Sequence, residues 1–194
     1  MTTPVLIAIA FLLGSVPTGL LIAKSRGIDP RTTGSGNIGA TNILRTTGKG
    51  AAALTLAGDM LKGMIVVSVS IAAGKETTAV GLIGIAAVLG HDFSIFLRLK
   101  GGKGVATSFG VLAVYAPQTA LLTGIIWLMT ARMSRYSSLG ALVSFGMLPL
   151  TIAVCDSREK LLAAVVLALL IFIKHRDNIK RLLKGQESKI GGSR

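Results

Sequence analysis

The sequence predicts an all-α polytopic membrane protein with seven transmembrane helices, on the strength of three observations. About half of the 194 residues (51%) are hydrophobic, and the mean hydropathy is positive at +0.70. The apolar residues form long runs rather than amphipathic segments. Only 15% of the residues are charged, yet the net charge is +13, because Lys and Arg gather in the connections between the runs. Together these features are typical of a chain that crosses a bilayer several times.

Seven apolar runs are the candidate spans. They lie near 4–23, 51–73, 78–97, 105–116, 118–131, 139–154 and 161–173. A perpendicular helix needs about 20 apolar residues to cross the hydrocarbon, and the fourth, fifth and seventh runs are shorter than that. The stretch 105–131 could be one span kinked at Pro117, which gives six helices, or a tight hairpin, which gives seven.

The distribution of Lys and Arg distinguishes the two counts. With seven spans, 17 of the 21 Lys and Arg residues fall on one side, in the segments 24–50, 98–104, 132–138 and 174–194. Three fall on the other side, and Lys62 lies within a span. With six spans the same residues divide ten and ten. Because positively charged connections stay in the cytoplasm, we expect seven spans, with the N-terminus outside and the C-terminus in the cytoplasm.

Composition also limits the class of protein. We expect residues 1–194 to form a single integral-membrane domain, because the polar residues are confined to connections and a basic C-terminal segment. A pI of 10.6 often indicates nucleic-acid binding, but a membrane protein collects positive charge on one side anyway, so no nucleic acid is expected as a partner. The single cysteine, Cys155, cannot form an intramolecular disulfide. No metal, no cofactor and no cleavable signal peptide are predicted.

Two glycine-rich stretches imitate nucleotide-binding motifs. Residues 34–42 read GSGNIGATN, with the G-x-G-x-x-G spacing of a dinucleotide-binding turn, but polar RGIDPRTT precedes them where that fold requires a buried strand. Gly102 and Lys103 resemble the end of a phosphate-binding P-loop. However, Leu97 and Gly104 stand where that motif requires Gly and Ser or Thr, so neither stretch is a nucleotide site.

Both stretches nevertheless fit anion binding at the cytoplasmic surface. Glycines allow backbone N–H groups to approach an anion, and a nearby cation adds charge. The first stretch offers Ser35, Asn37, Gly39, Thr41, Asn42 and Arg45, and the second offers Gly101, Gly102, Lys103 and Gly104. We expect them to bind two phosphates, or one phosphate from both sides. The alternative is that each stretch is merely a tight turn between helices.

Four ionisable residues, Asp59, Lys62, His91 and Asp92, fall inside the predicted spans. Such residues are usually functional. Asp59 and Lys62, at i and i+3, could equally form a structural ion pair, and the other two could line a polar cavity open to the cytoplasm. Both interpretations stay open at this point. Four glycines are expected to allow close helix packing: Gly14, Gly19, Gly58 and Gly63.

Three stretches resemble a known family. They read SGNIGATNILRTTGK, GHDFSIFLRLKGGKGVATS and HRDNIKRLLKGQESKIG, and they are similar to the three motifs of the bacterial PlsY family of glycerol-3-phosphate acyltransferases. The resemblance covers nearly the whole chain, with the same length, span count and topology. The segment DFSIFLRL is looser than the family pattern, but it lies outside the glycine-rich core.

The resemblance implies transfer of a fatty acyl group from acyl phosphate to the 1-position of sn-glycerol 3-phosphate, giving lysophosphatidic acid and phosphate, the first step of phospholipid synthesis. It implies a multi-pass protein of the bacterial inner membrane, with its active site facing the cytoplasm and with membrane lipids as partners. The catalytic residues carried over by motif are Ser35, Arg45, Lys103, His175 and Asn178. The substrate-binding residues carried over are Asn37, Gly39, Thr41, Asn42, Gly101, Gly102, Gly104, Thr107 and Ser108, while Glu187 is expected to brace the C-terminal segment.

One absence bears on the mechanism. Many membrane-associated acyltransferases use a His followed five positions later by Asp, but here Phe96 follows His91 and Lys180 follows His175 at that spacing. We therefore expect no indispensable general base. Two rival functions predict other sequence features. A transporter of phosphorylated metabolites or lipids would show two related halves, and a non-catalytic docking subunit would not need Gly and Asn at so many fixed places.

Overall fold

The computed structural model describes residues 1–191, and every regular element in that range is helical. The all-α expectation is therefore confirmed for the described part, while residues 192–194 of the predicted cytoplasmic segment 174–194 lie outside it. The elements in order are α1 (Thr3–Ser15), α2 (Thr18–Lys24), α3 (Ala40–Thr46), α4 (Lys49–Ala72), α5 (Thr77–Asp92), η1 (Ile95–Leu97), α6 (Val105–Tyr115), α7 (Pro117–Ser134), α8 (Ser137–Gly146), α9 (Leu148–Cys155), η2 (Arg158–Lys160), α10 (Leu161–Lys174) and α11 (Arg176–Leu183).

Proline divides two of the predicted runs and separates two others. The first run breaks before Pro17 into α1 and α2, because proline has no N–H to continue the helical hydrogen bonds. Pro149 stands in the first turn of α9, and α8 and α9 are bent by 45° relative to each other. Pro117 opens α7, so the stretch 105–131 forms two helices that pack against each other, as the hairpin alternative requires.

Three helical segments are long and apolar enough to cross a membrane. They are Thr3–Lys24, Lys49–Ala72 and Thr77–Leu97, and the bent pair α8 and α9 would make a fourth if it is one span. Helix α6 has 11 residues, which rise about 17 Å against a hydrocarbon core of about 30 Å. The chain is therefore a helical membrane protein by length and composition, and the count of seven spans stays a prediction.

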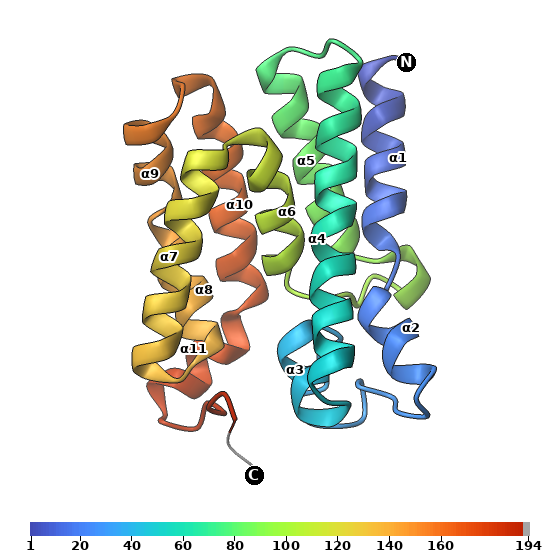
Figure 1. Cartoon of the computed structure of the whole chain (residues 1–194), viewed down its shortest axis with the longest axis vertical. Helices are drawn as coiled ribbons and strands as arrows, with labels where there is room; N and C mark the ends of the chain where they lie inside the picture. The colour runs from blue at the N-terminus through green and yellow to red at the C-terminus, as the bar shows by residue number, and fades with distance from the viewer. Residues whose placement is uncertain (192–194) are drawn as a thin grey trace.

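The segments predicted to be cytoplasmic gather at one end of the molecule. Figure 1 shows the N-terminus at the top, together with the turns that follow α4, α6 and α9. Helices α2, α3 and α11 and the segment that follows α11 as far as Gly191 lie at the bottom. The connections from α5 to α6 and from α7 to α8 also lie in the lower half. The three motif stretches, far apart in sequence, thus meet at the same end.

The helices pack through small residues, and many large apolar side chains face outward. A Cβ atom on Gly14 would lie 2.1 Å from the carbonyl oxygen of Ala87, and one on Gly90 would lie 2.1 Å from that of Phe11, so α1 and α5 touch backbone to backbone. This confirms the packing role expected for Gly14. Meanwhile Leu121 is 68% exposed and Val154 is 76% exposed, as expected of side chains that face lipid.

Candidate functional site

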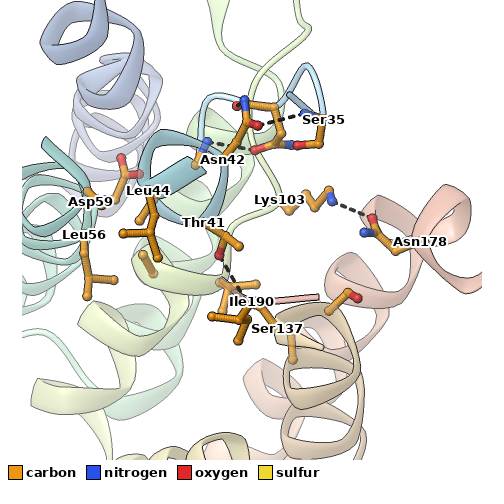
Figure 2. A pocket seen from close by; sticks show the side chains of 18 of the residues that line it. Ser35, Thr41, Asn42, Leu44, Leu56, Asp59, Lys103, Ser137, Asn178 and Ile190 are labelled. Carbon is orange, nitrogen blue, oxygen red and sulfur yellow. Dashed lines mark hydrogen bonds between the residues drawn. The ribbon is translucent and has the colours of Figure 1, made fainter. Parts of the chain in front are cut away.

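A cavity of about 780 Å³ lies where the three motif stretches meet. Its volume is in the range of small-molecule sites in proteins. Figure 2 shows Ser35 and Lys103 on one side of it and Leu44 and Leu56 on another. The cavity therefore combines polar and cationic groups with an apolar wall, which also includes Met60, Phe109, Trp127 and Ile190.

Asn42 fixes the shape of the first glycine-rich loop. Its buried carboxamide donates through Nδ2 to the backbone carbonyls of Pro30 (3.0 Å), Thr33 (3.2 Å) and Asn37 (2.7 Å). Its Oδ1 accepts from the backbone N–H of Ser35 at 2.8 Å. The carboxamide is thus engaged at both ends, so Asn42 holds the loop together, whereas its motif position predicted a hydrogen bond to substrate.

The first and third motifs are tied together at the cavity. Arg45, in the last turn of α3, donates through Nη2 to the backbone carbonyl oxygens of Ser188 at 2.9 Å and Lys189 at 3.4 Å. Thr41, one turn earlier, shares a hydrogen bond of 3.1 Å with the hydroxyl of Ser137 at the start of α8. The C-terminal segment therefore closes over α3, and it carries Ser188 and Ile190 into the cavity lining.

Lys103 is a partly buried cation of the site. Its Nζ donates to Oδ1 of Asn178 at 2.5 Å, as Figure 2 shows, and Asn178 in turn donates to Glu187 Oε1 at 2.6 Å. Burial lowers the pKa of Lys103 to about 8, against the opposing effect of the Glu187 charge. A lysine in this position is still charged at neutral pH, but it gains strongly from an anionic ligand that restores its solvation.

Glu187 accepts three hydrogen bonds at the edge of the cavity. Besides Asn178, it accepts from the Ser138 hydroxyl at 2.8 Å and from Arg181 Nε at 2.7 Å. Burial alone would raise the pKa of Glu187, but these three donors outweigh it and the pKa is lowered. Glu187 is therefore ionised and braces α11 and α8, in line with its expected bracing of the C-terminal segment.

His175 is held as a neutral imidazole. Its Nδ1 lies 2.8 Å from the carbonyl oxygen of Ile171, which can only accept, so the proton sits on Nδ1 and Nε2 is left as an acceptor. Burial and the neighbouring Lys103 charge lower the pKa of His175 to about 4. His175 can thus receive a hydrogen bond from a ligand at neutral pH, but it is a weak base there.

The second glycine-rich loop lies directly on the end of α5. The N–H of Gly101 donates to the carbonyl oxygen of Asp92 at 3.2 Å, and that of Gly102 donates to the carbonyl oxygen of His91 at 3.0 Å. These two amides, expected to meet an anion, already have partners in the chain. Both glycines line a second cavity of about 300 Å³, which shares Lys103 and Asn178 with the first.

The structure brings most of the expected site residues together. Those lining the larger cavity are Ser35, Asn37, Gly39, Thr41, Asn42, Arg45, Lys103, Gly104, His175 and Asn178. Thr107 and Ser108 line neither cavity. Both are fully buried in α6, and neither hydroxyl has a hydrogen-bond partner within residues 1–191.

Arg181, Ser137 and Ser138 also line the larger cavity, and none of the three was predicted from the sequence. For Arg181 a signal was available. His175, Asn178 and Arg181 are spaced by three residues, and on a helix that spacing places them on one face. No comparable pattern marks the two serines, because they reach the cavity through the packing of α7 and α8 against the C-terminal segment.

The fold and the cavity together define a helical membrane protein whose site is cationic on one side and apolar on another. The model of the glycerol-3-phosphate acyltransferase family matches residues 4–185. The chain belongs to this bacterial family of membrane acyltransferases.

Known relatives match over nearly their full length. Glycerol-3-phosphate acyltransferase from Geobacter sulfurreducens is 43% identical over 186 residues, covering 95% of this chain and 96% of that protein. The Mesorhizobium japonicum protein of the same name is 47% identical over 194 residues, covering 98% of each. A crystal structure of PlsY, an integral membrane glycerol 3-phosphate acyltransferase in its glycerol 3-phosphate form, is 38% identical. It superposes with a TM-score of 0.93 over 98% of this chain and 96% of that chain. The lysophosphatidic acid form gives a TM-score of 0.91.

Proposed function

We propose that this protein transfers a fatty acyl group from acyl phosphate to the 1-hydroxyl of sn-glycerol 3-phosphate. The observation that carries the proposal is the larger cavity, where all three motif stretches meet and where Arg45 and Lys103 lie beside an apolar wall. Both substrates are phosphate anions, and one of them has a fatty chain. Solved relatives described as glycerol 3-phosphate and lysophosphatidic acid forms support the choice of acceptor and product.

The two halves of the cavity take different parts of the substrates in this proposal. Arg45, Lys103 and Arg181 supply positive charge for the phosphates, and the hydroxyls of Ser35 and Thr41 supply further hydrogen bonds. The acyl chain lies along the apolar wall, whose members Leu44, Leu56, Phe109 and Trp127 offer no competing polar contact to a hydrocarbon except the indole N–H. Glycerol 3-phosphate, acyl phosphate and surrounding lipid are then the partners of the chain.

The reaction requires little beyond positioning and charge stabilisation. The 1-hydroxyl oxygen attacks the acyl carbonyl carbon, the bond from that carbon to the phosphate oxygen breaks, and the hydroxyl proton passes to an oxygen of the departing phosphate. Acyl phosphate is a mixed anhydride, so phosphate already leaves readily. Lys103 and Arg45 stabilise the charge that develops on the oxyanion and the phosphate. Because His175 keeps its proton on Nδ1 and is a weak base, it orients the hydroxyl through Nε2.

The donor assignment is tested by assay of the purified protein. With labelled glycerol 3-phosphate, acyl phosphate is expected to give lysophosphatidic acid and one equivalent of inorganic phosphate. Acyl-CoA at the same chain length and concentration is expected to give little product, because the cavity lining has one tryptophan and no cluster of aromatic residues for an adenine ring. Comparable turnover with acyl-CoA would exclude this donor assignment.

The pH dependence of kcat/KM should report Lys103. The pKa of this lysine is about 8, so kcat/KM is expected to fall as the pH rises through that value and the ammonium loses its charge. On the acid side, kcat/KM should rise through about pH 6 as the substrate phosphate becomes a dianion. Lys103→Arg should move the alkaline fall to higher pH, since arginine stays charged. His175→Ala should show the same acid rise and the same alkaline fall of kcat/KM as the wild type. If the alkaline fall stayed at the same pH in Lys103→Arg, its assignment to Lys103 would be contradicted.

We further propose seven spans in the bacterial inner membrane, with the chain as one domain and the cavity facing the cytoplasm. The 17 Lys and Arg residues on one side of such a topology support it. In a Cys155→Ser background, a cysteine at position 76 is expected to react with an impermeant thiol reagent added from outside, and one at position 100 is not. The reverse pattern would exclude the orientation and the location of the site together.

A further inference from the structure

Three ionisable side chains form a buried cluster between α4 and α5 that the proposed reaction does not use. We call Asp59, Lys62 and His91 the buried triad. The Nζ of Lys62 lies 2.9 Å from Asp59 Oδ1 and 2.8 Å from His91 Nδ1, and all three residues are at most 5% exposed. Asp59 and His91 also line the larger cavity. Burying charged groups costs desolvation free energy, so such a cluster is expected to have a specific role.

Hydrogen-bond chemistry fixes the orientation of the His91 ring. An ammonium group can only donate, so Nδ1 of His91 accepts from Lys62 and the hydrogen of the neutral ring sits on Nε2. That edge of the ring abuts the second glycine-rich loop: a Cβ atom on Gly102 would lie 2.1 Å from Nε2. Asp59 in turn accepts from the Thr18 hydroxyl, and Lys62 donates to the Val16 carbonyl at 3.2 Å. The triad thereby connects the junction of α1 and α2 to the loop.

Backbone hydrogen bonds also hold the second glycine-rich loop against His91. The Gly102 N–H donates to the His91 carbonyl, and the Gly101 N–H donates to the Asp92 carbonyl. Lys103 is the next residue, and its Nζ reaches Asn178 on α11. Asp59 is thus connected to Lys103, on the cationic side of the cavity, through its salt bridge with Lys62, the His91 ring and Gly102.

We propose that the buried triad is a positioning device: it sets the orientation of the His91 ring, on which the Gly101–Gly104 loop rests, and so fixes Lys103 in the site. The proposal depends on the role of Lys103 in the proposed function. Asp59, Lys62 and His91 are positioning residues here. Lys62 Nζ, Asp59 Oδ1 and His91 Nδ1 are engaged with one another, which leaves the chemistry to Lys103 and the substrates.

The test is a double-mutant cycle between the triad and Lys103. In His91→Asn the shorter side chain can still accept from Lys62, but it no longer reaches Gly102. A misplacement of about 1 Å can cost on the order of a hundredfold in rate, so kcat for acyl transfer is expected to fall about tenfold to a hundredfold. In a Lys103→Ala background the same change is expected to alter kcat by less than about twofold, because the group it positions is gone.

Controls separate positioning from loss of fold. Ser70→Ala removes another buried hydrogen bond of α4, from the Ser70 hydroxyl to the Val66 carbonyl, outside both cavities, and should leave kcat unchanged in either background. Removing both charges together in Asp59→Asn/Lys62→Met avoids an unpaired buried ion and serves if His91→Asn yields no folded protein, as judged by size-exclusion chromatography and thermal unfolding in detergent. The pair is expected to show the same coupling to Lys103→Ala.

The outcomes are distinct. Equal fold-changes from His91→Asn, or from the pair, with and without Lys103 would mean that the triad acts independently of Lys103, and this would overturn the inference while leaving the proposed function intact. If Lys103→Ala left kcat for acyl transfer unchanged, the proposed role of Lys103 would be wrong, and so would the inference that depends on it. Loss of most of the effect in the Lys103→Ala background supports the positioning role.

Discussion

Alanine at position 103 is expected to lower kcat/KM for acyl transfer by roughly tenfold to over a hundredfold, and alanine at position 45 by a similar factor. In the proposed function each substitution removes a charge-assisted hydrogen bond to a phosphate, and such a bond contributes on the order of 1.5–3 kcal/mol. Lys103 and Arg45 are partly buried in the cavity lining, where water screens the interaction less than at the surface. Steady-state kinetics in detergent with both substrates varied would measure the effect.

Lys24→Ala is the matched control for these two variants. Lys24 ends α2 at the same end of the molecule, is exposed, and lines neither cavity. We assign it to membrane topology, so its removal should change kcat/KM by less than about twofold. If all three variants lost activity equally, the positive charge would act through general attraction of anions, and the phosphate contacts assigned to Lys103 and Arg45 would be wrong.

Glu187→Ala is expected to lower kcat/KM on the order of a hundredfold and also to lower the thermal stability. The carboxylate accepts from Ser138, Asn178 and Arg181, and a hydrogen bond to a charged group contributes about 1.5–3 kcal/mol. Without it, Asn178 and Arg181 lose the partner that holds α11 against the cavity. Activity and the midpoint of thermal unfolding, measured on the same preparation, would report both losses.

The stability difference should also depend on pH. Hydrogen bonds hold the pKa of Glu187 below its ordinary value of 4.5 despite burial. A depressed folded-state pKa adds stability above the unfolded value, and this contribution is lost as the pH falls through the folded one. The gap between wild type and Glu187→Ala should therefore be full at pH 7 and shrink below about pH 4.5.

Asp29→Ala is the control for Glu187→Ala, because Asp29 also pairs with an arginine at this end of the molecule. The Arg31 to Asp29 pair, at 2.6 Å, is more exposed and lies outside both cavities. Exposed ion pairs contribute little, so activity should be nearly unchanged. Comparable losses from the two variants would indicate that any acid-to-alanine change disturbs the protein, and Glu187 would have no special bracing role.

The sequence by itself determined the helical class, the apolar segments and the meeting of the motifs at one surface. Apolar runs specify helices in a bilayer, because backbone groups there have no other way to form hydrogen bonds. Lys and Arg are costly to move across the membrane, so their positions assign the sides of the connections. The side-chain types of Ser35, Arg45 and Lys103 indicate hydrogen bonding and positive charge without knowledge of the fold. All three residues line the larger cavity. The family followed from the same motifs.

Only the tertiary structure decided which polar groups are free to act. Asn42 has the composition of a ligand-binding residue, but its carboxamide is used inside its own loop. The amides of Gly101 and Gly102 are used in the same way by the end of α5. Arg181 enters the cavity because α11 turns it there, and Glu187 holds it. Whether a donor meets substrate or its own chain depends on where the folded backbone places the carbonyl groups around it, and the residue types alone do not show those positions.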